Sequence, residues 1–197
     1  MICMIEYNAQ TGKELMQKYL GEPKLSKRLE HSLAVGDFSS KVAGKIKQRN
    51  PELDFDADLC EFLGYSRDIG YSVKAGKHEV HTIDILQKEG VDPQIAKKAM
   101  HGQLIEQFGI KENNVEQYTP SGVEGMILTY CDMSVRSGEL VTIRERAEEI
   151  VERVKSIPMP EELKKDIEVN LHKALPRFER YEKIVLALAG VNSAKEF

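Results

Sequence analysis

Five side chains that can give a lone pair to a metal ion are spread along segments with helical patterns: His31, Asp68, His78, His101 and Asp132. Neutral imidazoles and ionised carboxylates are what a buried metal site in a helical protein requires, with one or two ligands from each helix. Arg67 directly precedes Asp68, but a guanidinium has no lone pair to give and stays charged at ordinary pH. Arg67 therefore cannot be a ligand, and its place beside Asp68 needs another explanation.

The scaffold that must position these side chains is predicted to be all-α. Strand signals are weak, because few β-branched runs alternate with polar residues. Thr142 and Glu145 form a capping box, and Asp92 followed by Pro93 is typical of a helix start. Helices are expected near residues 11–20, 24–49, 56–67, 78–89, 93–107, 121–135, 142–156 and 160–190. Segment 69–77 contains two glycines and is expected to be a loop.

Two of the five side chains are predicted to point into the core. His31 shares a helix face with Val35, Phe38 and Val42, so its imidazole is either a hydrogen-bonded core group or a ligand. Asp132 lies in the middle of an apolar helix, where an unpaired carboxylate is costly. Either a metal ion or a nearby arginine would supply the partner that Asp132 needs.

Two charged segments can be interpreted either as ordinary surface residues or as functional ones. Lys24, Lys27 and Arg28 form a small basic group before His31, which either favours solubility or guides an anionic substrate. The mixed charges of residues 144–153, such as Glu149 with Arg153, predict solvent-exposed helix pairs.

The C-terminal third carries one apolar stripe at helical spacing, formed by Ile167, Leu171, Ala174, Phe178, Tyr181, Val185 and Leu188. Pro176 lies within it and is expected to kink or break the helix, because its ring clashes with the preceding turn. The stripe either packs on the core of the same chain or forms the interface of a homodimer.

The bulk composition is that of a single globular domain of 197 residues with a net charge of −4. This charge argues against a nucleic-acid-binding protein that relies on bulk positive charge. Cys3, Cys60 and Cys131 are far apart and odd in number, which indicates reduced thiols rather than disulfides. Neither a long apolar run nor a signal-peptide pattern is present, so we expect a cytoplasmic protein that does not interact with membranes.

The order of these motifs resembles that of the HD-domain metal-dependent phosphohydrolases over residues 20 to 150. The segment from His31 to Val35 resembles their first motif, and the segment from Phe62 to Gly70 is similar to their signature segment, which carries a His-Asp pair. His78 and His101 fall where the family has further histidines. The segment from Tyr130 to Asp132 is similar to the final aspartate motif. Each motif alone is weak, whereas the ordered set is specific.

The resemblance implies an HD-domain-like helical bundle, and with a short N-terminal helix this domain is expected over residues 1–150. A helical extension over residues 151–197 is expected to pack on the same core. The resemblance implies one or two divalent ions, and the mixed nitrogen and oxygen ligands admit Mn, Fe, Co, Ni or Zn. His31, Asp68 and Asp132 would hold the first ion, and Asp68, His78 and His101 the second. Such sites hydrolyse small phosphorylated molecules, nucleotides among them.

One position departs from the family pattern, because Arg67 stands where the family has the histidine of its His-Asp pair. The change removes one ligand from the first ion and adds a fixed charge beside it. Three outcomes are open: one metal is kept at the His78 and His101 end, Arg67 binds a substrate phosphate, or Arg67 pairs with Asp68 or Asp132 in a pocket without metal.

These outcomes lead to two hypotheses about function. In the first, the protein is a metal-dependent phosphohydrolase with Asp68 and Arg67 as candidate catalytic residues. In the second, it is a catalytically impaired domain that binds a phosphorylated ligand without efficient hydrolysis. Metal content separates the two hypotheses, and the substitution Arg67→His, which restores the missing lone pair, is expected to raise metal affinity and activity.

Overall fold

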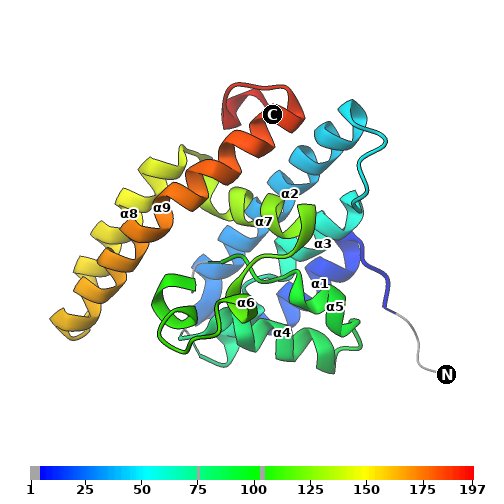
Figure 1. The fold of residues 1–197 in the computed structure, drawn as a ribbon. Helices are drawn as coiled ribbons and strands as arrows, with labels where there is room; N and C mark the ends of the chain where they lie inside the picture. Colours follow the sequence, from blue (N-terminus) through cyan, green and yellow to red (C-terminus); the bar gives the residue numbers. More distant parts are fainter. Residues whose placement is uncertain (1–4, 75, 103–104) are drawn as a thin grey trace.

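The computed structural model describes residues 5–74, 76–102 and 105–197. Figure 1 shows the helices that make up almost all of this part of the chain. In chain order the elements are α1 (Ala9–Leu20), η1 (Pro23–Leu25), α2 (Ser26–Arg49), α3 (Ala57–Ser66), η2 (Ile69–Ser72), α4 (His78–Lys88), α5 (Pro93–Lys97), η3 (Ile105–Gly109), α6 (Val115–Tyr118), α7 (Gly122–Ser134), β1 (Val135–Arg136), β2 (Glu139–Leu140), α8 (Ile143–Ser156), α9 (Glu161–Ala189) and η4 (Ala194–Glu196). The all-α fold expected from the sequence is therefore confirmed.

Helix α7 lies at the centre of the bundle and contacts α2, α3, α8 and α9. Every residue from Ile127 to Ser134 is buried, as expected of a helix that is apolar on all sides. The largest apolar cluster joins α7 to α2, α8 and α9, and a second cluster joins α1, α3, α4 and α5. Asp132, near the end of α7, is thereby carried into the interior between these clusters.

Helices α8 and α9 form a long antiparallel hairpin that extends beyond the rest of the bundle (Figure 1). Ala174, Phe178 and Val185 of the apolar stripe are buried in the main cluster, so the stripe packs on the core of its own chain. The expected break at Pro176 is wrong, since α9 runs unbroken through it. Ala174 and Phe178, on either side of it, are buried in the main cluster, although proline cannot donate a backbone hydrogen bond within the helix.

The predicted helix over 93–107 is also wrong, because α5 ends at Lys97. After it, the backbone hydrogen bonds join residues three apart, as in the bond from Met100 N to Lys97 O. Gly102 then adopts a left-handed φ of 74°, which a helix cannot continue. His101 consequently lies in an irregular segment rather than at a helix end, and residues 103 and 104 lie outside the described part.

The only strands in the described residues are β1 and β2, an antiparallel pair of two residues each. Ser137 and Gly138 connect them with φ values of 49° and 82°. A two-residue hairpin turn of this kind needs positive φ at both positions, and Ser-Gly takes the place of the commoner Asn-Gly. The hairpin turns the chain from α7 into α8 and so places α8 beside His31.

Cys60 and Cys131 are buried and free, whereas Cys3 lies outside the described residues. Within the described ranges, none of the helices combines the length and apolar character needed to cross a bilayer.

A glycine at a close approach between η2 and α4 gives the first testable prediction. A Cβ on Gly70 would lie 2.0 Å from the carbonyl oxygen of His78 and 2.6 Å from the backbone nitrogen of Thr82. We expect Gly70→Ala to lower the free energy of unfolding by about 3 kcal/mol, because backbone on both sides must move. Gly44→Ala is the matched control, since a Cβ there meets nothing within 4 Å, and it should stabilise by about 0.5–1 kcal/mol. Urea denaturation of both variants measures the difference.

Candidate metal centre

The five predicted ligands converge from five separate parts of the chain. His31 comes from α2, Asp68 from the turn before η2, His78 from the start of α4, His101 from the segment after α5, and Asp132 from α7. Their donor atoms form two groups that share Asp68, and the atoms of each group lie within 4.8 Å of one another. The first group is His31, Asp68 and Asp132, and the second is Asp68, His78 and His101.

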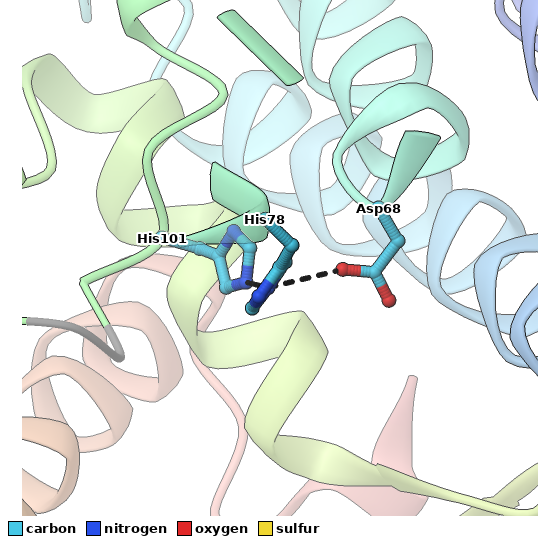
Figure 2. Close-up of side chains that lie close together, drawn as sticks. All are labelled: Asp68, His78 and His101. Carbon is cyan, nitrogen blue, oxygen red and sulfur yellow. Dashed lines mark hydrogen bonds and ion pairs between the residues drawn. The ribbon is translucent and has the colours of Figure 1, made fainter. Parts of the chain in front are cut away.

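The second group is open to a cation, and Figure 2 shows its three side chains pointing toward one another. His78 Nε2 lies 3.5 Å from Asp68 Oδ1 and 3.4 Å from His101 Nε2. Around a tetrahedral ion with bonds of about 2.0–2.1 Å, neighbouring ligand atoms lie about 3.3–3.4 Å apart. The distances from His78 to the other two donors therefore match those around a divalent ion, and all three donor atoms lie within 4.8 Å of one another.

His78 is held in the neutral form that a metal requires. Burial lowers the pKa of His78 to about 3, although the carboxylate of Asp68 opposes this shift. Its ring stacks on Tyr71 with centroids 4.2 Å apart, which fixes the direction of Nε2. The lone pair of His78 is therefore available at neutral pH.

His101 has a different environment, because a second buried carboxylate lies beside it. Glu79 Oε1 is 3.5 Å from His101 Nε2, and Glu79 is fully buried. Burial opposes protonation, but the negative charge of Glu79 raises the pKa of His101 above its ordinary value. The same charge favours a cation at this end of the site. His101 Nδ1 lies 3.2 Å from the carbonyl oxygen of Ala99, which orients the ring.

The first group is filled by a protein cation, the guanidinium of Arg67. Its Nε donates to Asp132 Oδ1 at 2.8 Å, and its Nη2 donates to Asp68 Oδ2 at 3.2 Å. The remaining nitrogen, Nη1, donates to the carbonyl oxygen of Gly64 at 3.0 Å. Arg67 is fully buried, so its donors face the protein interior rather than a ligand.

Arg67 thus pairs with Asp68 and Asp132, as in the third of the outcomes considered from the sequence. The second ligand group, of Asp68, His78 and His101, is nevertheless intact. Burial alone would raise the pKa values of Asp68 and Asp132, but the charge of Arg67 holds both below their usual range. Asp68 turns Oδ2 toward Arg67 and Oδ1 toward His78. One carboxylate thus neutralises the arginine with one oxygen and offers the other to the histidine pair.

The loop that carries Arg67 and Asp68 is fixed by Thr82 of α4. The Thr82 hydroxyl donates to the carbonyl oxygen of Arg67 at 2.8 Å and accepts from the backbone N–H of Gly70 at 2.9 Å. The same helix begins with His78, so these two hydrogen bonds hold Asp68 and His78 at a fixed distance from each other.

A cavity of about 250 Å³ adjoins the two groups and is lined by four of the five candidate ligands: His31, Asp68, His78 and Asp132. Arg28, Arg146 and Arg153 also line it. The sequence interpretation missed Arg146 and Arg153 as site residues, because it assigned the charges of this segment to exposed helix pairs. The expected pair of Glu149 with Arg153 is present at 3.4 Å. The signal that could have found them is their spacing of seven residues, which places both on one face of α8.

His81, one turn after His78, is partly exposed and belongs to neither ligand group among the described residues. No protein-family model matches this chain, and no match was found among curated proteins or solved structures.

Proposed function

We propose that this protein is a metal-dependent phosphohydrolase that acts on a small phosphorylated molecule and uses one divalent ion, held by Asp68, His78 and His101. The observation that carries the proposal is that these three buried side chains bring their donor atoms within 4.8 Å of one another, with His78 Nε2 at 3.4 Å from His101 Nε2 and 3.5 Å from Asp68 Oδ1. The ordered motifs, which resemble those of the HD-domain phosphohydrolases, support the same reaction. A divalent ion would supply a water of lowered pKa and stabilise charge on the phosphoryl oxygens.

The side chains around the ion would supply fixed charge and would bind and orient the substrate. Arg67 places a fixed positive charge between Asp68 and Asp132, where the resemblance expects the first ion. Asp68 is the side chain common to both ligand groups, so it links this charge to the histidine pair. Arg28, Arg146 and Arg153 face the cavity and would bind the phosphate oxygens and orient the ester beside the candidate ligands.

A second candidate function, a phosphate-binding domain without efficient hydrolysis, is favoured by one observation. Arg67 already satisfies Asp132, and Asp132 is one of the ligands that the resemblance assigns to the first ion. A site that needs two ions for turnover would then be inactive, while the arginines would still bind an anion.

Metal analysis combined with a hydrolysis assay tests the proposal. Purified protein would be loaded separately with Mn²⁺, anaerobic Fe²⁺, Co²⁺, Ni²⁺ and Zn²⁺, and its bound metal and its activity on a panel of phosphomonoesters measured. We expect about one ion per chain and hydrolysis that EDTA abolishes. His101→Ala should weaken metal binding by about tenfold or more, because it removes one of the three protein ligands.

His81→Ala is the matched control for this experiment. It removes a histidine from the same region of α4, outside both ligand groups, and should leave metal content and activity unchanged. Metal binding without hydrolysis of any phosphomonoester would favour the binding domain. Absence of bound metal under every loading condition would overturn the assignment of Asp68, His78 and His101 as ligands.

A further inference from the structure

The cavity next to the metal centre has two chemically different sides, and the first is cationic. Arg146 is only 5% exposed, and its Nε has no hydrogen-bond partner among the described residues. Its Nη2 lies 3.4 Å from His31 Nε2, so the guanidinium stands at the edge of the ligand groups. A buried donor without a partner is costly, and an anion in the cavity would satisfy it.

The other side of the cavity is aliphatic and comes from the hairpin of α8 and α9. Five apolar side chains form this wall: Ile150, Val154, Ile157, Met159 and Ile167. A ligand that places its phosphate against the arginines would therefore place the rest of its structure against an apolar surface. Burial of apolar groups there is favourable, whereas burial of unpaired hydroxyl or amide groups is costly.

Apart from the groups around the metal centre and the arginines, the described lining has few polar groups that would recognise a nucleobase or a sugar. Tyr71 is the one phenyl-type ring among these lining residues, and it is already in contact with the His78 ring, at 4.2 Å between centroids, and with the guanidinium of Arg28, at 3.9 Å from the ring centroid. No serine, threonine, asparagine or glutamine is found among the described residues that line the cavity. Ribose hydroxyls would therefore have to pair with the Tyr71 hydroxyl or with the charged groups that the phosphate and the metal centre also use.

We propose that the ligand of this cavity is a small phosphomonoester whose alcohol part is aliphatic, and that nucleotides and polyol phosphates bind poorly. This inference rests on the proposed function, because it takes the phosphate to lie over the metal centre. The size of the cavity agrees with a ligand of this class. An apolar cavity of about 150 Å³ accommodates benzene, so about 250 Å³ leaves room for a phosphate and a chain of a few carbons.

Three phosphomonoesters of graded polarity test the inference: n-butyl phosphate, glycerol 3-phosphate and adenosine 5′-monophosphate. Their dissociation constants would be measured by calorimetry on EDTA-treated protein, so that hydrolysis does not consume them. Removal of metal weakens all three alike, because each carries the same phosphate, and the ratios are preserved. We expect n-butyl phosphate to bind about tenfold more tightly than glycerol 3-phosphate, since it buries two groups that are hydroxylated in the latter.

Two pairs of variants assign the two sides of the cavity. Ile157→Asn should reduce the preference for n-butyl phosphate to about threefold or less, whereas Ile110→Asn, also at an exposed position but outside the cavity, should not change it. Arg153→Met should weaken all phosphomonoesters and inorganic phosphate alike by about fivefold to tenfold. Arg144→Met, on the same helix but paired with Glu179, should leave them unchanged.

The outcomes separate this inference from the proposed function. If n-butyl phosphate binds with the stated preference but no phosphomonoester is hydrolysed with any of the five metals, the proposed function is wrong and the ligand class is supported. If hydrolysis occurs but glycerol 3-phosphate or adenosine 5′-monophosphate binds as tightly as n-butyl phosphate, the ligand class is wrong. Absence of binding for all three compounds, or an unchanged preference in Ile157→Asn, would also overturn the inference.

Discussion

Replacement of Arg67 by methionine should lower the free energy of unfolding of the metal-free protein by about 3–5 kcal/mol. The guanidinium is fully buried and donates to Asp132 and Asp68 at 2.8 and 3.2 Å, so its removal leaves two buried carboxylates without their main counter-charge. Methionine has a similar length and fills part of the space, so the loss would reflect charge rather than a cavity. Urea denaturation at pH 7 in the presence of EDTA measures the effect.

A second substitution separates the electrostatic cause from a packing cause. Asp132→Asn in the Arg67→Met background removes one of the two buried carboxylate charges that have lost the arginine, and it should recover part of the lost stability. Asp132→Asn alone should destabilise the protein. Arg144→Met is the control for loss of a surface arginine and should change the free energy of unfolding by less than about 0.5 kcal/mol. If Arg67→Met cost no more than this control, the buried carboxylates would not depend on Arg67.

The inward direction of two of the candidate ligands, His31 and Asp132, could be predicted from the sequence, because both lie on regular helices. His31 shares the inward face of α2 with Val35, Phe38 and Val42, all of which are buried. Asp132 follows from α7, a helix whose apolar residues leave no exposed face for a carboxylate. The inward direction of these two side chains depends only on helical periodicity, which a sequence displays directly.

The state of Arg67 could not be predicted, because it depends on contacts between distant segments. The three outcomes differ only in where one flexible side chain points. That direction is set by Asp132 of α7, by Asp68 and by the carbonyl oxygen of Gly64. Sequence periodicity contains no information on which of these acceptors a guanidinium will reach.

The cationic and aliphatic sides of the cavity were missed for a related reason. Arg146 and Arg153 both lie near Glu149 in the sequence, which predicts local helix pairs, and such pairs are present. Their role in the cavity exists only because the α8 and α9 hairpin lies over the ends of α2 and α4. This arrangement is set by the turn at Ser137 and Gly138 and by the packing of α9 on α7, both of which are tertiary features.

Replacement of Arg67 by histidine should have the second large effect, a change in metal stoichiometry from about one to about two ions per chain. The Nε of arginine and the Nε2 of histidine are each four bonds from the Cα atom. An imidazole at this position can therefore bring a lone pair to the place where Arg67 Nε now lies, 2.8 Å from Asp132 Oδ1. His31, Asp68 and Asp132 would supply the other donors of the first group.

The substitution also removes the charge that now excludes a cation from the first group. In metal-free buffer the Arg67→His variant should be destabilised much like Arg67→Met, because both lose the guanidinium. Excess Mn²⁺ should restore the midpoint of thermal unfolding of Arg67→His but not of Arg67→Met, since only the histidine can complete the first group. Hydrolysis by Arg67→His should rise about tenfold or more if the first ion contributes to the reaction. A fall in activity despite two bound ions would instead identify Arg67 as a residue that the reaction itself requires.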